Sequence, residues 1–470
     1  MEITIMGTNS KKGLGISTRS FVVALVIIFI LMCVTYAVTF IVPGGQYERV
    51  EENGQEIIVT DSFQYTEGGM PFWKWILSPF LVLGAEGSGT IIAVIIFLLL
   101  VGGVFNALDK SGMMKYMLGK IVSRFGAVRY KLLAIIVFFF MAMGAFIGSF
   151  EECVPLVPIV VGLALALGWD ELTGLGMSLL AIGCGFAAGV CNPFTVGVAQ
   201  ELAGLPMFSG IWLRLVAFAL IYIVVLLFIR HHAKKVERPI EAQELNKEFV
   251  HDKNMDVALV IFAVVLGSGI CVVLSSVFVP AIQDYTMIIV ALTFLVAGVG
   301  SVLMAGMDTA ALTRHFFNGI ASILPAVLMI LMASSIKYTL VEGGILDTLL
   351  YYAVEIAQQL PLELMILFIY LIVLFMNFFI SSGSAKAFLL IPVVVPLGQI
   401  FGISPQLSVL AFAFGDGFSN ILYPTNAVLL ISLGLANVSY GKWFKWTWKI
   451  QAIILALTSA LLLLGLALNY

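Results

Sequence analysis

Two adjacent carboxylates, Glu151 and Glu152, lie between two long apolar runs of this chain. A carboxylate at bilayer depth costs about 2.5–3.5 kcal/mol on insertion scales, and it normally faces a cavity or a partner. Gly148 and Ser149 precede the pair and two prolines follow it closely, so we expect the backbone not to be α-helical there. A polar break in an apolar segment is tolerated only where it is buried in protein or lines a water-filled site. The sequence therefore predicts a binding site at this break.

The composition predicts an all-α polytopic membrane protein. Hydrophobic residues make up 61% of the chain and charged residues 11%, with a mean hydropathy of +1.09. A soluble domain carries about 25% charged residues. We expect a prokaryotic plasma (inner) membrane protein with the lipid bilayer as its surroundings, no cleaved signal and no nucleic-acid partner. The five cysteines lie in apolar stretches, which favours buried hydrophobes over a disulfide or metal role. No cofactor is expected apart from a coupling ion, H⁺ or Na⁺.

Charge patterning predicts which ends of the spans face the cytoplasm. Basic residues in the tail 1–19 precede the first apolar run, 20–43, which places the N-terminus in the cytoplasm. The polar, basic connection 231–255 is expected on the same side, and it divides the chain into a first half, 20–230, and a second half, 256–470. Hydropathy does not decide whether 130–168 forms two full spans or a re-entrant hairpin. The hairpin is favoured because it brings the basic residues at 230–238 to the cytoplasm.

An internal repeat links the two halves. Similar landmarks recur in the same order at spacings of 231–233 residues, as in Phe146–Ser149 against Phe379–Ser382 and Pro193 against Pro424. Each copy begins with an amphipathic arm, flanked by basic residues in the first copy and by acidic residues in the second. Five predicted crossings separate the copies, so we expect them to be inverted. Inverted repeats with broken helices at the midplane are typical of secondary transporters.

Each half is expected to hold two breaks, a hairpin tip (149–152 and 381–386) and an unwound point (191–195 and 423–426). Helix ends and free carbonyls at one depth suit ions and charged solutes. The candidate substrate-binding residues are Ser149, Glu151, Glu152, Asn192, Thr195, Ser382, Ser384, Lys386, Asp416, Thr425 and Asn426.

Several of these residues also have a structural interpretation. Glu151 and Glu152 are either a functional pair that titrates together or a pair neutralised by a proton or by Lys386. Lys386 itself reaches an interface, neutralises an acid such as Asp416, or holds a substrate carboxylate. The Asn and Thr side chains at the unwound points cap half-helices, a role that a solute site also requires. Arg214 is expected to extend its charge to the membrane interface, and the four histidines to lie in solvated connections.

The segments Gly148–Glu152, Cys191–Thr195 and Tyr423–Asn426 carry a family resemblance that covers residues 20–468. The chain resembles the ion-transporter superfamily of elevator-type carriers. Within it, the chain is similar to the YfcC-type branch of the C4-dicarboxylate anaerobic carrier (DcuC-like) family, which is described as basic amino acid antiporters. The resemblance implies a scaffold that often dimerises and a transport domain that slides across the membrane. Sodium-coupled dicarboxylate relatives carry Ser-Asn-Thr at the hairpin tip, whereas this chain has Ser149-Phe150-Glu151, and an acidic site favours a cationic solute.

These observations predict a secondary active transporter of a basic amino acid such as arginine or ornithine, working by exchange or with proton coupling. The alternative within the same class is an anionic solute such as a C4-dicarboxylate, held by Lys386 and helix N-termini with the acids protonated. A membrane-embedded enzyme is a weaker alternative, because the spans lack a His/Glu metal motif and an activated nucleophile. A passive channel is disfavoured by the closed, glycine-broken hairpins.

Overall fold

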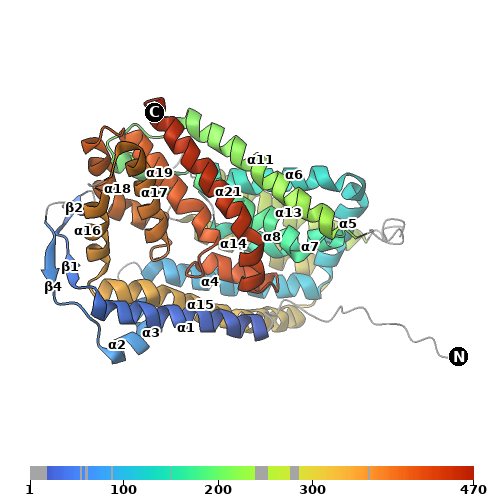
Figure 1. Ribbon diagram of the computed structural model, residues 1–470. Coiled ribbons are helices and arrows are strands. Elements are labelled where there is room, and N and C mark those ends of the chain that lie inside the picture. The colour runs from blue at the N-terminus through green and yellow to red at the C-terminus, as the bar shows by residue number, and fades with distance from the viewer. Residues whose placement is uncertain are drawn as a thin grey trace.

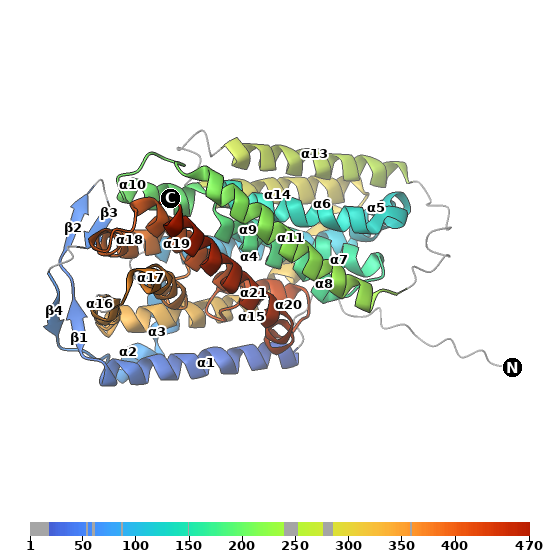
Figure 2. The same ribbon diagram turned by 45° about the horizontal axis from the view of Figure 1, so that its top comes forward.

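The computed structural model describes residues 18–52, 55–58, 62–85, 88–148, 150–238, 252–275, 285–357 and 360–470. These residues form an elongated, mostly helical molecule with short strands at one end (Figure 1). A view turned by 45° shows α1 along one edge of the molecule and α13 along the opposite edge, with the other helices between them (Figure 2).

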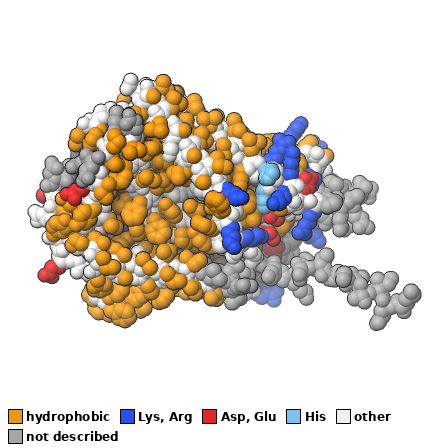
Figure 3. Space-filling model, viewed as in Figure 1, with side chains coloured by type: hydrophobic (Ala, Val, Ile, Leu, Met, Phe, Trp, Pro, Cys, Tyr) orange, Lys and Arg blue, Asp and Glu red, His pale blue; other side chains and the backbone are white. Residues whose placement is uncertain are grey.

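Eight helical segments of the described chain are long and apolar enough to cross a membrane. About 20 apolar helical residues span the hydrocarbon core of a bilayer. The broad hydrophobic face in Figure 3 agrees with lipid contact, and Lys, Arg and His gather towards the end where α5 lies. The segments are α4 (Ser88–Lys110), Met113–Ile147, Glu171–Leu202, α11 (Ile211–Val236), α13 (Lys253–Ser275), α15 (Thr309–Glu342), α18 (Gly383–Ile400) and α21 (Tyr440–Ala467).

One group of helices consists of α1 (Thr18–Ile41), α4, α13, α14 (Thr286–Met304) and α15. Helix α1 contacts α15, α15 contacts α4, α4 contacts α14, and α14 contacts α13. Small residues bring α4 and α15 close together. A Cβ on Gly102 would lie 2.3 Å from Cγ1 of Ile323, and one on Gly319 would lie 2.3 Å from the carbonyl oxygen of Gly102. Such close approach lets helices associate in lipid, where apolar side chains gain little by burial.

The rest of the chain consists of two runs of elements in matching order. The first is α5 (Met113–Phe125), α6 (Arg129–Ala142), the π-turn η3 (Met143–Ile147), the 3₁₀ turn η4 (Glu151–Leu156), α7 (Val157–Ala166), α8 (Glu171–Leu175), η5 (Gly176–Leu180), α9 (Ala181–Ala188), η6 (Pro193–Gly197), α10 (Val198–Leu202) and α11. The second is α16 (Leu346–Ala357), α17 (Leu362–Asn377), α18, α19 (Pro405–Gly417), η8 (Phe418–Ile421), α20 (Ala427–Leu435) and α21. The helical nature of both expected arms, α5 and α16, is confirmed, while their membrane sides and the inversion of the copies stay predictions.

Helices α9 and α19 pack on each other in the core, and every residue of α9 is buried. Glycines permit this contact. A Cβ on Gly417 would lie 2.1 Å from the Cα of Ala187, and one on Gly183 would lie 2.4 Å from Cγ2 of Ile421. Helix α6 contacts α9, and α17 and α18 contact α19, so both runs are built around this packed centre. We call α6–α7 and α17–α18, with the turns between them, the first and second hairpin; that they are re-entrant stays a prediction.

The polar connection after α1 holds two small antiparallel ladders. Strand β1 (Gly44–Gln46) pairs with β4 (Gln64–Thr66), and β2 (Arg49–Glu52) pairs with β3 (Gln55–Ile58). The β1–β4 ladder is tied to the second arm, because Gly45 N–H donates to the carbonyl of Gly344 at 2.8 Å and Tyr47 N–H donates to Oδ2 of Asp347 at 3.0 Å. The β2–β3 ladder contacts α18. The short helices α2 (Phe72–Ile76) and α3 (Ser78–Leu81) follow.

The expectation for the histidines is wrong for three of the four. His231 and His232 lie in the last turns of α11, which continues to Val236, and His315 lies in α15. The helix α11 extends beyond its apolar stretch, and His232 gains a half-buried partner there, Asp170. His251 lies outside the described residues. Cys153 and Cys184 are buried, as expected, whereas Cys33 and Cys191 are half-buried and Cys271 is exposed on α13.

Candidate functional site

The tip of the first hairpin packs against the break that follows α9. We call residues Gly189–Thr195 break 1: the irregular residues Gly189–Asn192 and the start of the π-turn η6. The unwound point predicted at 191–195 is therefore wrong for 193–195, which already belong to η6, because Asn192 caps this turn. Gly148 has φ +77°, and a Cβ on it would lie 2.2 Å from Oδ1 of Asn192. The N–H of Cys191 donates to the carbonyl of Ala145 at 3.0 Å. Only glycine accommodates both the left-handed backbone and the close approach at position 148.

The predicted break in the helix around the two acids is confirmed, because η4 is a short 3₁₀ turn that leads into α7. Glu151 lies half-buried at its start. The backbone of Glu152 is in the same turn, but its side chain lies outside the described part of the chain, as does all of Ser149. The two acids thus begin a turn at the hairpin tip, and their role stays a prediction.

Break 1 holds polar groups with unused hydrogen-bonding capacity. Oδ1 of the fully buried Asn192 accepts from the backbone N–H groups of Phe194 at 2.9 Å and Thr195 at 3.3 Å, the capping role expected of an amide at a half-helix. Nδ2 of Asn192 and Oγ1 of Thr195 are buried and lack a hydrogen-bond partner among the described atoms. Buried polar groups are usually satisfied, so these two atoms are available to a solute.

Arg214 supports break 1 from α11, and its expected position at the interface is wrong. The side chain is fully buried, its Nε donates to the carbonyl of Val190 at 3.2 Å, and its Nη2 donates to the carbonyls of Phe208 at 3.1 Å and Ser209 at 2.8 Å. Carbonyls freed by the unwound backbone attract the guanidinium inward, where it makes charge-assisted hydrogen bonds.

The second hairpin tip is shorter than expected. Helix α17 ends at Asn377 and α18 begins at Gly383, so the predicted break is wrong for residues 383–386, which form the first turn of α18. Ser382 caps this turn, its Oγ accepting from the N–H of Ala385 at 3.4 Å. The cap allows the helix to start early. Ser382 is exposed, Ser384 is half-buried and Lys386 is fully buried.

Lys386 forms a buried ion pair with Asp416. Its Nζ lies 2.5 Å from Oδ1 of Asp416, and the two side chains are 0% and 1% exposed. The same ammonium donates to Oδ1 of Asn377 and to the carbonyl of Ile380 at 3.2 Å. Of the interpretations that the sequence leaves open for Lys386, reaching an interface is wrong, and neutralisation of Asp416 is confirmed for this conformation.

Asn377 organises this ion pair and is missing from the sequence-predicted set. Its Nδ2 donates to the carbonyl of Asp416 at 2.9 Å and to Oδ1 of Asn420 at 2.9 Å, while its Oδ1 accepts from Lys386. The signal in the sequence is a lone amide at the end of the apolar run 364–376.

The second tip also contacts break 1. A Cβ on Gly383 would lie 2.4 Å from Cγ2 of Thr195 and 2.7 Å from Oδ2 of Asp416. Oδ2 of Asp416 is buried and has no hydrogen-bond partner among the described atoms. Break 1 therefore lies between the two hairpin tips.

Break 2 (Leu422–Asn426) has the matching position in the second half. Oγ1 of Thr425 donates to the carbonyl of Phe378 at 2.6 Å, which ties break 2 to the second tip. Asn426 caps α20 through Oδ1, which accepts from Leu429 N–H at 3.3 Å, and its Nδ2 donates to Oδ1 of Asn420 at 3.2 Å. Helix α20 in turn contacts η4 of the first hairpin.

Each hairpin thus lies against the helix that follows the break of the other half. Helix α18 contacts η6 and α10, and η4 and α7 contact α20. The arrangement brings Thr195 and Asp416 together at Gly383, with Lys386 paired to Asp416. Asn192 lies against Gly148 of the first tip, and Thr425 and Asn426 lie in break 2. Ser382 caps α18 and Ser384 lies in its first turn.

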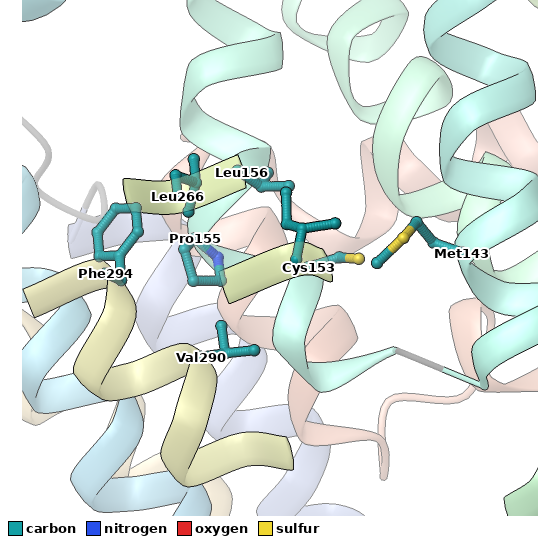
Figure 4. Close-up of a pocket in the computed structure, with 8 residues that line it drawn as sticks. Met143, Cys153, Pro155, Leu156, Leu266, Val290 and Phe294 are labelled. Carbon is teal, nitrogen blue, oxygen red and sulfur yellow. The ribbon is translucent and has the colours of Figure 1, made fainter. Parts of the chain in front are cut away.

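A small cavity of about 30 Å³ lies between the first hairpin and the helices α13 and α14. Figure 4 shows Met143, Cys153, Pro155 and Leu156 facing Leu266, Val290 and Phe294 across it. All eight residues that line it, Ile270 included, are apolar. A charged solute finds no partner there, so the cavity is an apolar contact surface rather than the charged-solute site.

A profile of C4-dicarboxylate anaerobic carriers matches residues 21–467. The chain belongs to the C4-dicarboxylate anaerobic carrier family. YfcC of Escherichia coli strain K12, named as a candidate basic amino acid antiporter, is 29% identical over 468 residues, covering 90% of this chain and 91% of YfcC. An uncharacterized protein of Haemophilus influenzae strain Rd is 22% identical over 520 residues, covering 98% of this chain and 99% of its own length. The crystal structure of the YdaH transporter of Alcanivorax borkumensis is similar over 96% of this chain and 98% of that one, with 18% identity and a TM-score of 0.45.

Membership in a carrier family, together with the apolar helices, makes this chain a multi-pass membrane transporter. Four of the eight buried side-chain polar atoms without a partner among the described residues lie at or beside these breaks and tips: Nδ2 of Asn192, Oγ1 of Thr195, Nη1 of Arg214 and Oδ2 of Asp416. The other four belong to Ser78, Trp169, Thr348 and Ser432. The group around the breaks also contains the buried charges of Lys386 and Asp416, and buried charges in membrane proteins are candidates for a solute site.

Proposed function

We propose that this carrier is a secondary active transporter of a basic amino acid such as arginine or ornithine, working by exchange or with proton coupling. The observation that carries the proposal is the position of Glu151 and Glu152 at a hairpin tip, in the turn η4 that contacts the helix following break 2. Adjacent acids at such a point favour a solute that brings positive charge.

The ion pair Lys386–Asp416 also favours a cationic solute over an anionic one. Asp416 already neutralises Lys386. In this conformation the positive charge that a dicarboxylate would need is paired with Asp416, and a dicarboxylate that took over Lys386 would bring a second negative charge next to Asp416. YfcC, with its name of a candidate basic amino acid antiporter, agrees with a cationic substrate. The printed description of the family, a C4-dicarboxylate carrier, favours the second candidate, an anionic solute bound with the acids protonated.

For the transport cycle we propose alternating access by an elevator movement. The two matching runs of elements move as the transport domain, with inverted topology and re-entrant hairpins, against the group α1, α4, α13, α14 and α15. This group forms the scaffold and the contact of a homodimer. The apolar lining between the first hairpin and α13–α14 supports the proposal, because an apolar surface slides without breaking hydrogen bonds. We place the carrier in the inner membrane with its N-terminus in the cytoplasm, coupled to H⁺ or Na⁺.

Counterflow in proteoliposomes tests the substrate. Labelled arginine, ornithine and succinate are offered to the purified full-length protein, and we expect uptake of the two basic amino acids. Glu151→Gln and Glu152→Gln are measured separately, with Glu201→Gln, an exposed acid at the end of α10, as the control. Loss of a desolvated charge pair costs about 2–5 kcal/mol, so at least one variant should bind arginine about 30-fold or more weakly.

A proton-carrying acid gives a different result. Its replacement by Gln would abolish uptake driven by a pH gradient and spare binding and exchange. If both variants bind and exchange arginine normally, the acids are not the substrate site. If the wild-type protein takes up succinate and not arginine, the cationic assignment is wrong.

A further inference from the structure

The buried ion pair Lys386–Asp416 is an expensive feature for a membrane protein. Both side chains are removed from solvent, 0% and 1% exposed, at the start of α18 and the end of α19. Taking two charges out of water costs free energy that their attraction only partly returns, so a buried pair is a poor device for stability alone. The pair lies one helical turn beneath Ser381 and Ser382, which are exposed at the tip.

The hydrogen-bonding capacity of Lys386 is filled, whereas that of Asp416 is not. The Lys386 ammonium has three donors, and it makes three contacts, to Asp416, Asn377 and the carbonyl of Ile380. Asp416 uses Oδ1 for the ion pair, but its Oδ2 is buried without a partner. Oγ1 of Thr195, from break 1, is also buried without a partner, and both Thr195 and Asp416 contact Gly383. An acceptor and a hydroxyl thus stand unused beside the pair.

We propose that the pair opens to hold the backbone groups of an amino acid. The substrate's α-ammonium binds Asp416 and Oγ1 of Thr195, and its α-carboxylate binds Lys386. This proposal rests on the proposed function, and it adds to it how the part common to all amino acids is recognised. The side-chain cation is assigned to the first tip, as in the proposed function.

Charge balance favours this exchange of partners. A zwitterion brings one positive and one negative group, so one internal ion pair is replaced by two intermolecular pairs without any net charge entering the site. When the solute leaves, Lys386 and Asp416 close on each other and neutralise the empty site. Asn377 anchors both partners, accepting from Lys386 and donating to the carbonyl of Asp416, so the elements stay in register while the pair opens. A dicarboxylate would leave Asp416 facing a like charge.

The test is the binding of arginine against two analogues, measured with labelled arginine on the full-length protein in nanodiscs. Agmatine lacks the α-carboxylate, and 5-guanidinopentanoate lacks the α-ammonium. A charge-assisted hydrogen bond contributes about 1.5–3 kcal/mol, so the wild-type protein should bind arginine about 10- to 100-fold more tightly than either analogue. Lys386→Met should no longer bind arginine more tightly than agmatine. Asp416→Asn should no longer bind arginine more tightly than 5-guanidinopentanoate.

Thr195→Val keeps the ion pair intact and so provides a readout if the charge variants fail to fold. This variant should bind arginine and agmatine more weakly than the wild-type protein and bind 5-guanidinopentanoate with unchanged affinity. Equal binding of arginine and both analogues by the wild-type protein, or unchanged preferences in these variants, would overturn the inference and leave the proposed function standing. If the wild-type protein binds a neutral amino acid with the same pattern, the inference holds and the cationic assignment fails. If no amino acid binds, both are wrong.

Discussion

Arg214 donates from Nε to the carbonyl oxygen of Val190 at 3.2 Å and thereby ties α11 to break 1. Trp443 does the equivalent in the second half, where its Nε1 donates to the carbonyl of Ile421 at 2.7 Å and ties α21 to the start of break 2. Both side chains are fully buried. Each half therefore uses its last helix to satisfy a carbonyl that its broken helix leaves open, which is a requirement for irregular backbone at membrane depth.

Replacement of Arg214 by Met should destabilise break 1. The carbonyls of Val190 and Phe208 lose their side-chain donor, and each unsatisfied buried group costs about 1–3 kcal/mol. The carbonyl of Ser209 keeps hydrogen bonds from Gln200 and Gln406. We expect a lower melting temperature in detergent and little or no transport. The control is Arg230→Met, an exposed position near the other end of α11, which should melt like the wild-type protein. If Arg214→Met melts at the same temperature as the wild-type protein, these hydrogen bonds do not stabilise break 1.

Gly383→Ala should interfere with closure of the second tip. The new methyl group would lie 2.4 Å from Cγ2 of Thr195 and 2.7 Å from Oδ2 of Asp416, and overpacking of this kind costs about 1–3 kcal/mol. We expect normal membrane insertion with exchange reduced about tenfold or more. Gly267→Ala in α13 is the matched control, because a Cβ there meets nothing within 4 Å. Undiminished exchange by Gly383→Ala would argue against a closed tip in the transport cycle.

The sequence predicts the breaks well and their partners poorly. Gly148, Pro193 and Pro424 interrupt apolar runs, and this local signal is readable without a structure. The early start of α18 at Gly383 was missed because Ser382 and the residues after it form a good cap and first turn, while the apparent tip motif extends to Lys386. Local patterns of this kind leave helix boundaries uncertain by a few residues.

The partners depend on tertiary contacts between distant segments. Arg214 resembles any basic residue near a span end until α11 is packed beside break 1. The pairing of Lys386 with Asp416 could be considered from the sequence, but the role of Asn377 could not, since it requires α17, α18 and α19 to meet. The β-ladders after α1 were missed because strands of three or four residues carry almost no periodic signal.

The charge of Asp170 should stabilise the fold at neutral pH, and this contribution to the free energy of unfolding should be lost in acid. It caps α8 and accepts from the N–H of Thr173 at 2.9 Å, and its Oδ2 lies 3.1 Å from Nε2 of His232. Burial acts to raise the pKa of Asp170, but the hydrogen bonds from His232 and Thr173 outweigh it and lower the pKa from 3.8 to about 2. A carboxyl with a lowered folded pKa stabilises the fold fully above its unfolded pKa, and this contribution disappears as the pH falls from about 4 to about 2.

The measurement is the melting temperature in detergent between pH 7 and pH 3. Asp170→Asn should melt lower than the wild-type protein at pH 7, and the difference should narrow at the acid end. The control is Glu171→Gln, whose ion pair with Lys442 spans 3.8 Å at the surface and contributes little. A constant difference across the pH range would show that Asp170 stabilises α8 without its charge.

The two arms should face opposite sides of the membrane. Basic residues flank α5 and acidic residues flank α16, and Lys and Arg are retained on the cytoplasmic side. The β1–β4 ladder that is tied to α16 belongs to the acidic connection after α1, so it should share its outer side. Asp347 is a poor reporter position because its side chain is buried against Tyr47. Exposed positions on the two arms are Lys115 and Glu355.

Single cysteines at these two positions test the arrangement. Cys271, the native cysteine that is exposed, is first replaced by Ala. In right-side-out vesicles, a membrane-impermeant maleimide should label Glu355→Cys and leave Lys115→Cys unlabelled, and inside-out vesicles should reverse the pattern. Labelling of both positions from one side would show that the two arms lie on the same side of the membrane. The inversion of the two copies would then be wrong, because an odd number of crossings between the arms requires them to lie apart.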